Sequence, residues 1–359
     1  MSIRLVQRER LGRGQAALIR LAAMVLALLV ASILLLCMGH NPLTAFGSML
    51  AGALGSKSNI NMTIVTTVPL VMISLGVAVA LHMGFTNVGG EGQLLAGAVC
   101  ATFVSHHLPM SLPAPLMLLA MAVAGMLGGL LIALIPGFFK ARFGVNETLF
   151  TLMLNYVMQY FVLMLRTQTW KDPKAMGFPK IAAVPPNAML PKWLGIHIGW
   201  VITLVLLVVV AVLLRRTKIG YEIRVVGASV NTARYAGMNV TKILLVGVCI
   251  SGAIAGLTGM VKLSGTSYNL AETIGGGSGF TAVIIAWLAK LSPVGILIIG
   301  FLFGVLTQGA MSMELAMGIP AALAEAIQGL ILFGALGCEF FIKYRPMLER
   351  RGRPEKEVA

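Results

Sequence analysis

Apolar runs of about 20 residues recur from one end of this 359-residue sequence to the other. A helix of about 20 apolar residues is long enough to cross the hydrocarbon core of a bilayer. Hydrophobic residues make up 58% of the chain and charged residues only 11%, whereas a typical soluble domain has about 25% charged residues. The sequence therefore predicts an all-α polytopic membrane protein.

About ten transmembrane helices are predicted. They lie at residues 18–39, 60–82, 92–108, 115–136, 147–165, 199–215, 243–263, 279–290, 293–309 and 323–341. The eighth is short and begins with glycines, which is typical of a broken or half helix. The connecting segments 166–198 and 216–242 are too polar, or too rich in proline, to span a membrane.

The formal net charge of +15 is best explained by membrane topology. With the N-terminus inside, only seven of the 27 Lys and Arg residues face outward: Lys57, Arg166, Lys171, Lys174, Lys180, Lys192 and Lys262. An excess of basic residues on the cytoplasmic side is the usual topology signal. We therefore predict cytoplasmic tails at 1–17 and 342–359, a transmembrane domain at 18–341, an external loop at 166–198 and a cytoplasmic loop at 216–242. Nucleic-acid binding is not expected, because no basic domain stands outside the membrane.

Two similar segments indicate an internal repeat. GFTNVGGEGQLLAGA leads the third span, and GGGSGFTAVIIAWLA leads the eighth, five spans later. Halves with an odd number of spans are inserted in opposite directions, which is the inverted-repeat plan of many transporters. We therefore expect two inverted five-helix halves that contain broken helices.

Several kinds of enzyme site are missing from the sequence. GxxxxGK[ST], HExxH and GxSxG do not occur, and Asp172 is the only aspartate. The four cysteines, at Cys37, Cys100, Cys249 and Cys338, fall in four different spans without metal-ligand spacing. The sequence therefore predicts no catalytic residue, no metal site and no cofactor on this chain.

The stretch GFTNVGGEGQ, residues 84–93, places polar residues between two strongly apolar runs. Its glycines weaken a helix by about 1 kcal/mol each relative to alanine, so the helix is expected to break there. Glu91 would gain from the dipole at the N-terminus of a new helix. Asn87 and Gln93 supply hydrogen-bond donors and acceptors.

A second polar cluster lies in GVNETLFTLMLNYVMQYF, where polar and aromatic residues recur at near-helical spacing. One interpretation is that these amides join neighbouring helices. The interpretation we favour for the set is a polar path suited to an uncharged hydroxylated or ring-bearing solute. The predicted path residues are Phe85, Asn87, Glu91, Gln93, Asn146, Glu147, Asn155, Tyr156 and Gln159.

The sequence resembles the permease subunits of bacterial ABC importers of the ribose and nucleoside branch. The resemblance is carried by NVGGEGQLLAGA, NETLFTLMLNYV, GYEIRVVGASVNTARYAGMN and GGGSGFTAVIIAWLAKLSPVGI. The TLMLNY run is most similar to the nucleoside-type permeases. Gly90, Trp287 and Ala289 depart from the usual residues of the branch.

This resemblance implies location and partners. Such a permease lies in the bacterial cytoplasmic (inner) membrane with both termini inside. It works with a separate ATPase chain that uses ATP, a second permease (a different chain or a copy of itself), and an external solute-binding protein or lipoprotein. In the loop 216–242, a short helix would dock on the ATPase; the expected coupling residues are Tyr221, Arg224, Asn231, Arg234, Tyr235 and Gly237.

Three alternatives stay open at this stage. The same type of importer could carry a monosaccharide such as ribose or galactose. A secondary transporter driven by H⁺ or Na⁺ would use Glu91 as its ion site. A membrane enzyme is the weakest alternative, because no nucleophile, metal site or pair of acids is visible.

Overall fold

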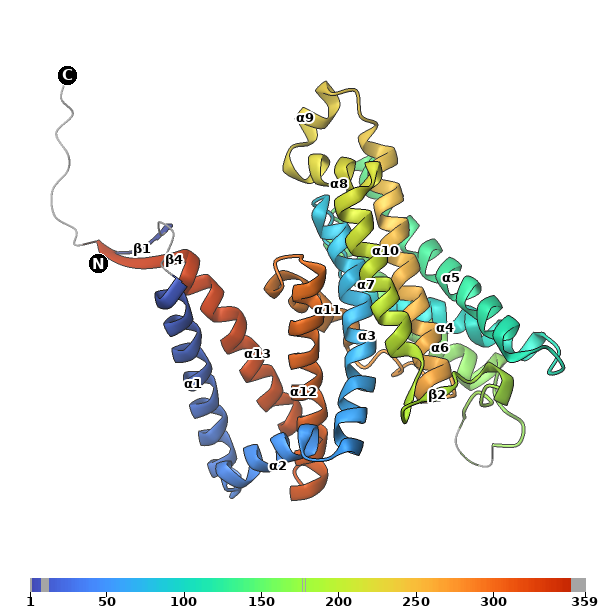
Figure 1. Cartoon of the computed structure of the whole chain (residues 1–359), viewed down its shortest axis with the longest axis horizontal. Coiled ribbons are helices and arrows are strands. Elements are labelled where there is room, and N and C mark those ends of the chain that lie inside the picture. Colours follow the sequence, from blue (N-terminus) through green and yellow to red (C-terminus); the bar gives the residue numbers. More distant parts are fainter. Residues whose placement is uncertain (1, 8–12, 176, 178, 350–359) are drawn as a thin grey trace. The chain divides into compact units, whose positions relative to one another are not determined.

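The structure, a computed structural model, describes residues 2–7, 13–175, 177 and 179–349. The chain divides into two units (Figure 1). The larger unit is Ala53–Gln308, and the smaller unit combines Met1–Gly52 with Gly309–Ala359. Helices α2 and α12 each run across the boundary.

The larger unit is almost entirely helical. Its α-helices are α3 (Lys57–His82), α4 (Gly90–His107), α5 (Ala114–Phe143), α6 (Glu147–Met164), α7 (Gly199–Arg216), α8 (Lys218–Ala228), α9 (Val230–Tyr235), α10 (Val240–Lys262), α11 (Ser278–Leu288) and the first part of α12 (Pro293–Met317). Shorter elements are the π-helical turns η1 (Leu165–Thr169) and η3 (Leu263–Ser267), the 3₁₀ turn η2 (Pro186–Ala188), and the strands β2 (Lys192–Trp193) and β3 (Ile196–His197).

Several of these helices begin at a polar capping residue. Ser56 accepts a hydrogen bond from the backbone N–H of Asn59 at the start of α3, and Asn239 accepts one from Lys242 at the start of α10. Such side chains satisfy backbone N–H groups that have no partner inside the helix. The helix starts are therefore set by local sequence as well as by packing.

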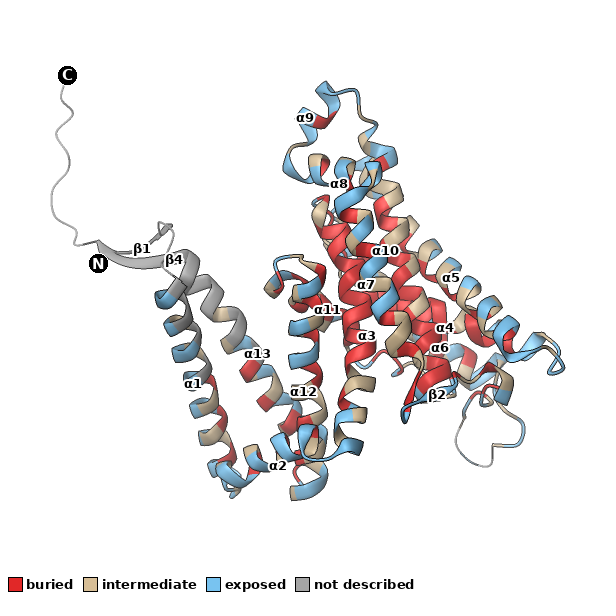
Figure 2. Ribbon diagram, in the orientation of Figure 1, coloured by how far each residue is buried: buried red, intermediate tan, exposed pale blue. Residues whose placement is uncertain are grey.

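The core of the larger unit lies along α3, α4 and α10, where the buried residues are concentrated (Figure 2). Helices α5 and α10 approach closely because glycines face each other. A Cβ on Gly256 would overlap the carbonyl oxygen of Gly125, and one on Gly129 would overlap that of Gly252. Small residues at such crossings bring helix backbones into contact, as in other membrane bundles.

Two helices of the larger unit begin after a segment that interrupts the helical path. Helix α3 ends at His82, and the chain passes through residues 83–89 before α4 begins at Gly90. Helix α10 is followed by η3 and by residues 268–277 before α11 begins at Ser278. The expected break at residues 84–93 and the expected short eighth helix are thus both present.

The two ends of the larger unit differ in the elements they carry. Figure 1 shows α8 and α9 at one end of its helices and strand β2 at the other. Strands β2 and β3 form a small antiparallel hairpin, with Lys192 opposite His197. The loops 166–198 and 216–242, predicted to face opposite sides of the membrane, therefore lie at opposite ends of this unit.

The smaller unit contains α1 (Arg13–Cys37), most of α2 (Pro42–Leu54), the end of α12, α13 (Ala321–Lys343) and the strands β1 (Ser2–Gln7) and β4 (Tyr344–Glu349). The two strands pair antiparallel, Ser2 with Glu349 through to Gln7 with Tyr344. Helices α1 and α13 also pack together.

Each of the ten predicted spans overlaps one helix, but fewer helices meet the requirement for crossing a membrane. Among the described residues, six are long and apolar enough, or seven if the bent pair Leu21–Cys37 and Pro42–Leu54 counts as one span. Helix α11 has only 11 residues, about 16 Å at 1.5 Å per residue. The polytopic all-α fold is confirmed, whereas ten spans in two inverted halves stays a prediction. Helix α2 was not predicted.

Candidate functional site

Glu91 lies in the first turn of α4 and is buried. Its Oε1 accepts a hydrogen bond from the backbone N–H of Gly277 (3.0 Å), and its Oε2 accepts one from Gly279 (2.7 Å). Both glycines belong to the start of α11, so the carboxylate lies between the N-termini of two helices. Helix dipoles favour a negative charge at such a position.

Lys262, the last residue of α10, reaches the same glycine run. Its Nζ donates to the carbonyl oxygen of Gly275 (2.9 Å) and lies 3.3 Å from Oγ of Ser278. Lys262 is among the basic residues predicted on the external side, and its ammonium group points toward the start of α11. It places a positive charge near the Glu91 carboxylate.

The predicted amides hold the broken backbone. Asn87 and Gln93 form two reciprocal hydrogen bonds of 3.0 Å, and Nδ2 of Asn87 also donates to Ser251 Oγ at 3.0 Å. Asn155, from α6, accepts from the backbone N–H of Gly92 (2.8 Å) and donates to the carbonyl oxygen of Val88 (3.0 Å). All three amides are buried. Their hydrogen bonds are therefore used to join helices and to satisfy the interrupted chain.

Glu91 also borders a pocket of about 350 Å³, which we call the Glu91 pocket. Two further polar residues reach it from α6, the predicted Gln159 and its neighbour Tyr160. The complete lining is Glu91, Gln159, Tyr160, Leu163, Glu272, Thr273, Gly276 and Gly277. The pocket thus joins residues of both sequence segments that were expected to form a path.

One ion pair at this pocket was not predicted from the sequence. Arg166, in η1, lies 3.0 Å from Oε1 of Glu272, and both side chains are largely covered by neighbours. The second carboxylate oxygen, Oε2, is buried without a hydrogen-bond partner among the described residues. More than 100 residues separate the pair, and no motif in the sequence connects them.

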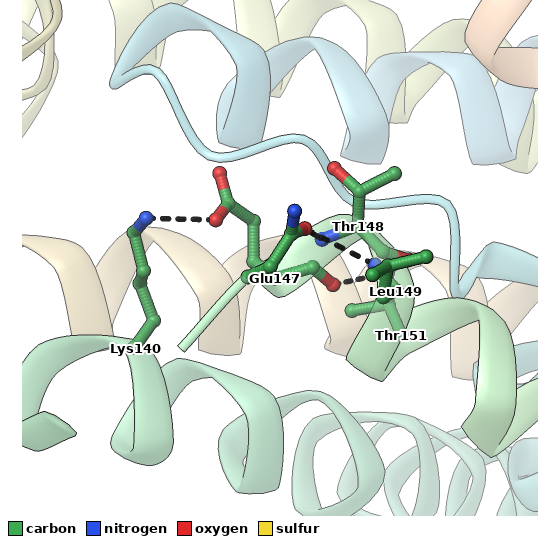
Figure 3. A network of polar contacts seen from close by, with 6 residues as sticks. Lys140, Glu147, Thr148, Leu149 and Thr151 are labelled. Carbon is green, nitrogen blue, oxygen red and sulfur yellow. Dashed lines mark hydrogen bonds and ion pairs between the residues drawn. The ribbon is translucent and has the colours of Figure 1, made fainter. Parts of the chain in front are cut away.

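The other predicted path residues lie outside the Glu91 pocket. Asn146 is exposed and caps α6, accepting from the backbone N–H groups of Thr148 and Leu149. Glu147 pairs with Lys140 of α5 at 2.8 Å (Figure 3). Phe85 is fully buried, and Tyr156 is 48% exposed on the outer face of α6.

The predicted coupling residues lie on α8, α9 and the turn after α9, and all of them are exposed. They are Tyr221, Arg224, Asn231, Arg234, Tyr235 and Gly237. Ser229 caps α9 by accepting from the N–H of Thr232 (3.2 Å). Gly237 has a φ of +73°, which ends the helix in a conformation that favours glycine. Ala233, between these residues on α9, is buried.

No metal centre is found in the part of the chain that the structure describes. There, no group of three or more His, Cys, Asp or Glu side chains is close enough together to hold a metal ion. Cys37, Cys100 and Cys249 are free thiols. Cys338 lies in α13, but its side chain is outside the described set.

Comparison with known proteins identifies the family. Residues 59–336 match the family described as the permease component of the branched-chain amino acid transport system. This match covers most of the chain, including every residue that lines the Glu91 pocket.

The chain belongs to this permease family.

Similar proteins are ABC transporter permeases. The glucose ABC transporter permease of Haloferax volcanii is 34% identical over 91% of this permease and 89% of its own length. The nucleoside permease NupB of Lactococcus lactis is 31% identical over 89% and 91%, and the guanosine permease NupP of Bacillus subtilis is 30% identical over 88% and 91%. The permease is therefore a multi-pass membrane protein and a transport subunit of an ABC importer, as the sequence predicted.

Proposed function

We propose that this permease forms the translocation path for a nucleoside in an ATP-driven importer, and that the Glu91 pocket is part of that path. The observation that carries the proposal is the meeting of α4 and α11 at the Glu91 carboxylate beside a polar pocket. Discontinuous helices whose N-termini meet at a polar site are a common way to build a solute site in a membrane protein. The names of two relatives, a nucleoside and a guanosine permease, support the substrate class.

The charges at the pocket favour a neutral solute with hydroxyl groups. Glu91 and Glu272 present carboxylate oxygens, which accept hydrogen bonds from O–H and N–H groups. Gln159 can both donate and accept, and Tyr160 adds an aromatic face. Arg166 balances the charge of Glu272, and Lys262 lies near Glu91, so these four groups together carry no net charge. A neutral nucleoside is therefore favoured over a nucleotide, whose phosphate would find no uncompensated positive charge there.

A monosaccharide is the second candidate. Its hydroxyl groups would donate hydrogen bonds to the same carboxylates and to the amide of Gln159. The relative from Haloferax volcanii is named for glucose. A nucleobase differs from a sugar in having a planar π-face that stacks on aromatic side chains, and uptake of labelled nucleosides and sugars separates the two candidates.

The proposal includes an assembly in the cytoplasmic membrane. An ATPase chain would dock on α8 and α9, whose predicted coupling residues are exposed. A second permease would complete the pore, and an external binding protein or lipoprotein would deliver the solute. Both termini would be cytoplasmic and residues 166–198 external. The proposal of two inverted halves is supported by the recurrence of one chain order: α3, a non-helical segment and α4, and later α10, a non-helical segment and α11.

ATP-driven uptake in proteoliposomes tests the proposal. The permease is reconstituted with its ATPase, partner permease and binding protein, and uptake of labelled guanosine, uridine, ribose and glucose is compared. We expect nucleoside uptake that needs ATP and persists when the proton gradient is collapsed. Uptake that stops with the gradient while ATP is maintained would overturn the importer and favour an ion-coupled transporter.

A further inference from the structure

A second pocket lies at the C-terminal end of α4, away from Glu91 at the start of that helix. It has a volume of about 210 Å³, the room of about seven liquid water molecules. One wall is the last two turns of α4, and the other is the segment that follows η1. We call it the ring pocket after three of its lining residues, Phe103, His107 and Trp170.

These three rings are nearly parallel. The Phe103 and His107 rings stack with centroids 4.0 Å apart and planes at 26°. The Phe103 and Trp170 centroids are 6.3 Å apart, with planes at 27°. Parallel rings beside a cavity offer flat faces to another ring, which prefers an offset-stacked arrangement.

The polar residues around the ring pocket include hydrogen-bond acceptors as well as one cationic donor, Lys171. Nδ1 of His106 lies 2.9 Å from the carbonyl oxygen of Thr102, and Nδ1 of His107 lies 2.8 Å from that of Phe103. A carbonyl oxygen only accepts, so Nδ1 is the donor in these two contacts, and the tautomer with its proton on Nδ1 presents Nε2 as an acceptor. Asp172 adds a carboxylate at the pocket edge.

The wall that carries Trp170 and Asp172 is fixed by backbone pairing. Lys171 and Ile181 form an antiparallel bridge, and the N–H of Asp172 donates to the carbonyl oxygen of Lys180 at 2.8 Å. Oδ1 of Asp172 accepts from the N–H of Lys174 at 2.9 Å, and Ile181 is buried. These contacts hold the aromatic and acidic groups in place before any ligand arrives, which reduces the entropy lost on binding.

We propose that the ring pocket is a separate binding site for a planar heteroaromatic ring that carries N–H or amino donors, the chemistry of a nucleobase. Aromatic faces recognise the ring by stacking, and His106, His107 and Asp172 accept its hydrogen bonds. The pocket lies at the end of the unit opposite α8 and α9, where a solute arrives from outside before it reaches the Glu91 pocket. The choice of a nucleoside as the natural ligand rests on the proposed function.

Binding of radiolabelled guanosine to the full-length permease in lipid nanodiscs tests this site. Stacking on an aromatic side chain contributes enough that its truncation weakens binding by about five- to a hundred-fold. We expect that loss in Trp170→Leu and Phe103→Leu, and near wild-type binding in Trp170→Phe, which keeps a ring. Trp193→Leu is the matched control: Trp193 lies in the same connecting segment as Trp170, stacks on Trp200 of α7 and does not line the pocket. Unlabelled uridine should compete, and ribose should not.

A Glu91→Leu variant separates this site from the proposed path. Guanosine binding that persists in Glu91→Leu and is lost in Trp170→Leu supports the ring pocket, even if the assembled importer transports no nucleoside. Binding that is lost in Glu91→Leu but unchanged in Trp170→Leu and Phe103→Leu overturns the ring pocket and leaves the proposed function standing. The ring pocket is also overturned if Trp170→Leu changes only the amount of inserted protein, because Trp170 is then a membrane-interface anchor.

Discussion

At the scale of single residues, the carboxylate of Glu91 combines two tasks. It accepts backbone N–H groups from Gly277 and Gly279, which as part of a helix start have no partner within their own helix. It also borders the Glu91 pocket, so a solute would contact the group that holds α11 in place. Asn87, Gln93 and Asn155 have a structural task, because their hydrogen bonds are made to neighbouring segments of the chain.

Two substitutions of Glu91 should separate the contribution of its side-chain shape to uptake from the contribution of its hydrogen bonds. Glu91→Gln keeps one acceptor oxygen and nearly the same shape, so we expect part of the ATP-driven uptake to remain. Glu91→Leu removes both acceptors and leaves the ammonium of Lys262 without its nearby carboxylate. A lost hydrogen bond to a charged group costs about 1.5–3 kcal/mol, so uptake should fall about ten- to a hundred-fold.

The control for this pair is Glu325→Leu, the same change at an exposed position of α13. Initial uptake rates, corrected for the amount of folded permease, are compared in proteoliposomes. Equal rates in Glu91→Leu and Glu325→Leu would show that the Glu91 carboxylate supports no step of transport.

His197 should make stability depend on pH. Its ring is 4% exposed, its Nδ1 accepts from the N–H of Gly199 (3.2 Å), and its Nε2 has no partner among the described residues. Burial, and secondarily the charge of Lys192, lower the pKa of His197 below its ordinary value of about 6.5. The unfolded chain therefore binds a proton more readily than the folded one. This stability contribution is complete above about pH 6.5 and is lost as the pH falls toward the lowered pKa.

The loss reaches at most about 1.4 kcal/mol per pH unit for one group. His197→Asn retains an acceptor near Nδ1 but does not titrate, so its melting temperature should fall less than that of wild type between pH 7.5 and 5.5. Thermal unfolding followed by tryptophan fluorescence measures both proteins under the same conditions. If the melting temperatures of wild type and His197→Asn fell by the same amount over this pH range, His197 would not be the source of the pH dependence.

At the scale of helices and loops, close approach of backbones shapes the larger unit. Glycines lie where helices α4, α5 and α10 cross, and these crossings leave no room for a larger side chain. The hydropathy of the sequence locates such helices, because apolar length is a local property. It does not indicate which glycines face one another, since that depends on the crossing of helices distant in sequence. The ion pair of Arg166 with Glu272 could not be predicted for the same reason, because it joins residues that are distant in sequence.

Alanine substitutions should have opposite effects at two helical glycines. Gly256→Ala places a methyl group against the backbone of α5, and overpacking of this kind costs about 1–3 kcal/mol. Gly47→Ala, in α2, meets no atom within 4 Å, and alanine favours the helix by about 1 kcal/mol. We expect a lower melting temperature for Gly256→Ala and an unchanged or higher one for Gly47→Ala. A Gly256→Ala protein as stable as wild type would contradict the packing described for α5 and α10.

The α9 segment should affect coupling without affecting folding. Arg234→Glu reverses an exposed charge, and Gly237→Pro forces φ to about −65° where the native value is +73°. In the assembled importer we expect both variants to insert normally, to bind the ATPase more weakly, and to uncouple ATP hydrolysis from uptake. Lys57→Glu, an exposed charge reversal at the start of α3, is the control. Full ATP-driven uptake by both α9 variants would show that segment 216–242 does not couple the permease to the ATPase.

At the scale of the whole molecule, the sequence predicted the class of protein better than the path through it. Composition and the basic loops pointed to a polytopic membrane protein, and GFTNVGGEGQ marked a helix break that the structure contains. Glu91 and Gln159, two of the predicted path residues, line the same pocket, and their role in a path stays a prediction. Tyr156 and Asn146 were not brought to the Glu91 pocket, because helical spacing alone does not tell which face of α6 turns inward. Helix α2 was missed because residues 42–54 are shorter than a span.

Topology is the prediction at this scale. Seven of the 27 basic residues lie on the predicted external side, so Lys180→Cys, in a background with Cys37, Cys100, Cys249 and Cys338 replaced, should react with a membrane-impermeant maleimide added outside intact cells. Arg224→Cys should react only after the cells are opened. The reverse labelling pattern would invert the orientation of the whole chain.

The shortness of α11 has a consequence for biogenesis. Its 11 residues cover about half of a hydrocarbon core of about 30 Å, so the translocon has no complete span to release into lipid at this point of synthesis. The backbone N–H groups of Gly277 and Gly279 acquire their acceptor only from Glu91, about 190 residues earlier in the chain. We therefore expect α11 to take its final position after α4 is in place, because α4 carries the acceptor for the start of α11.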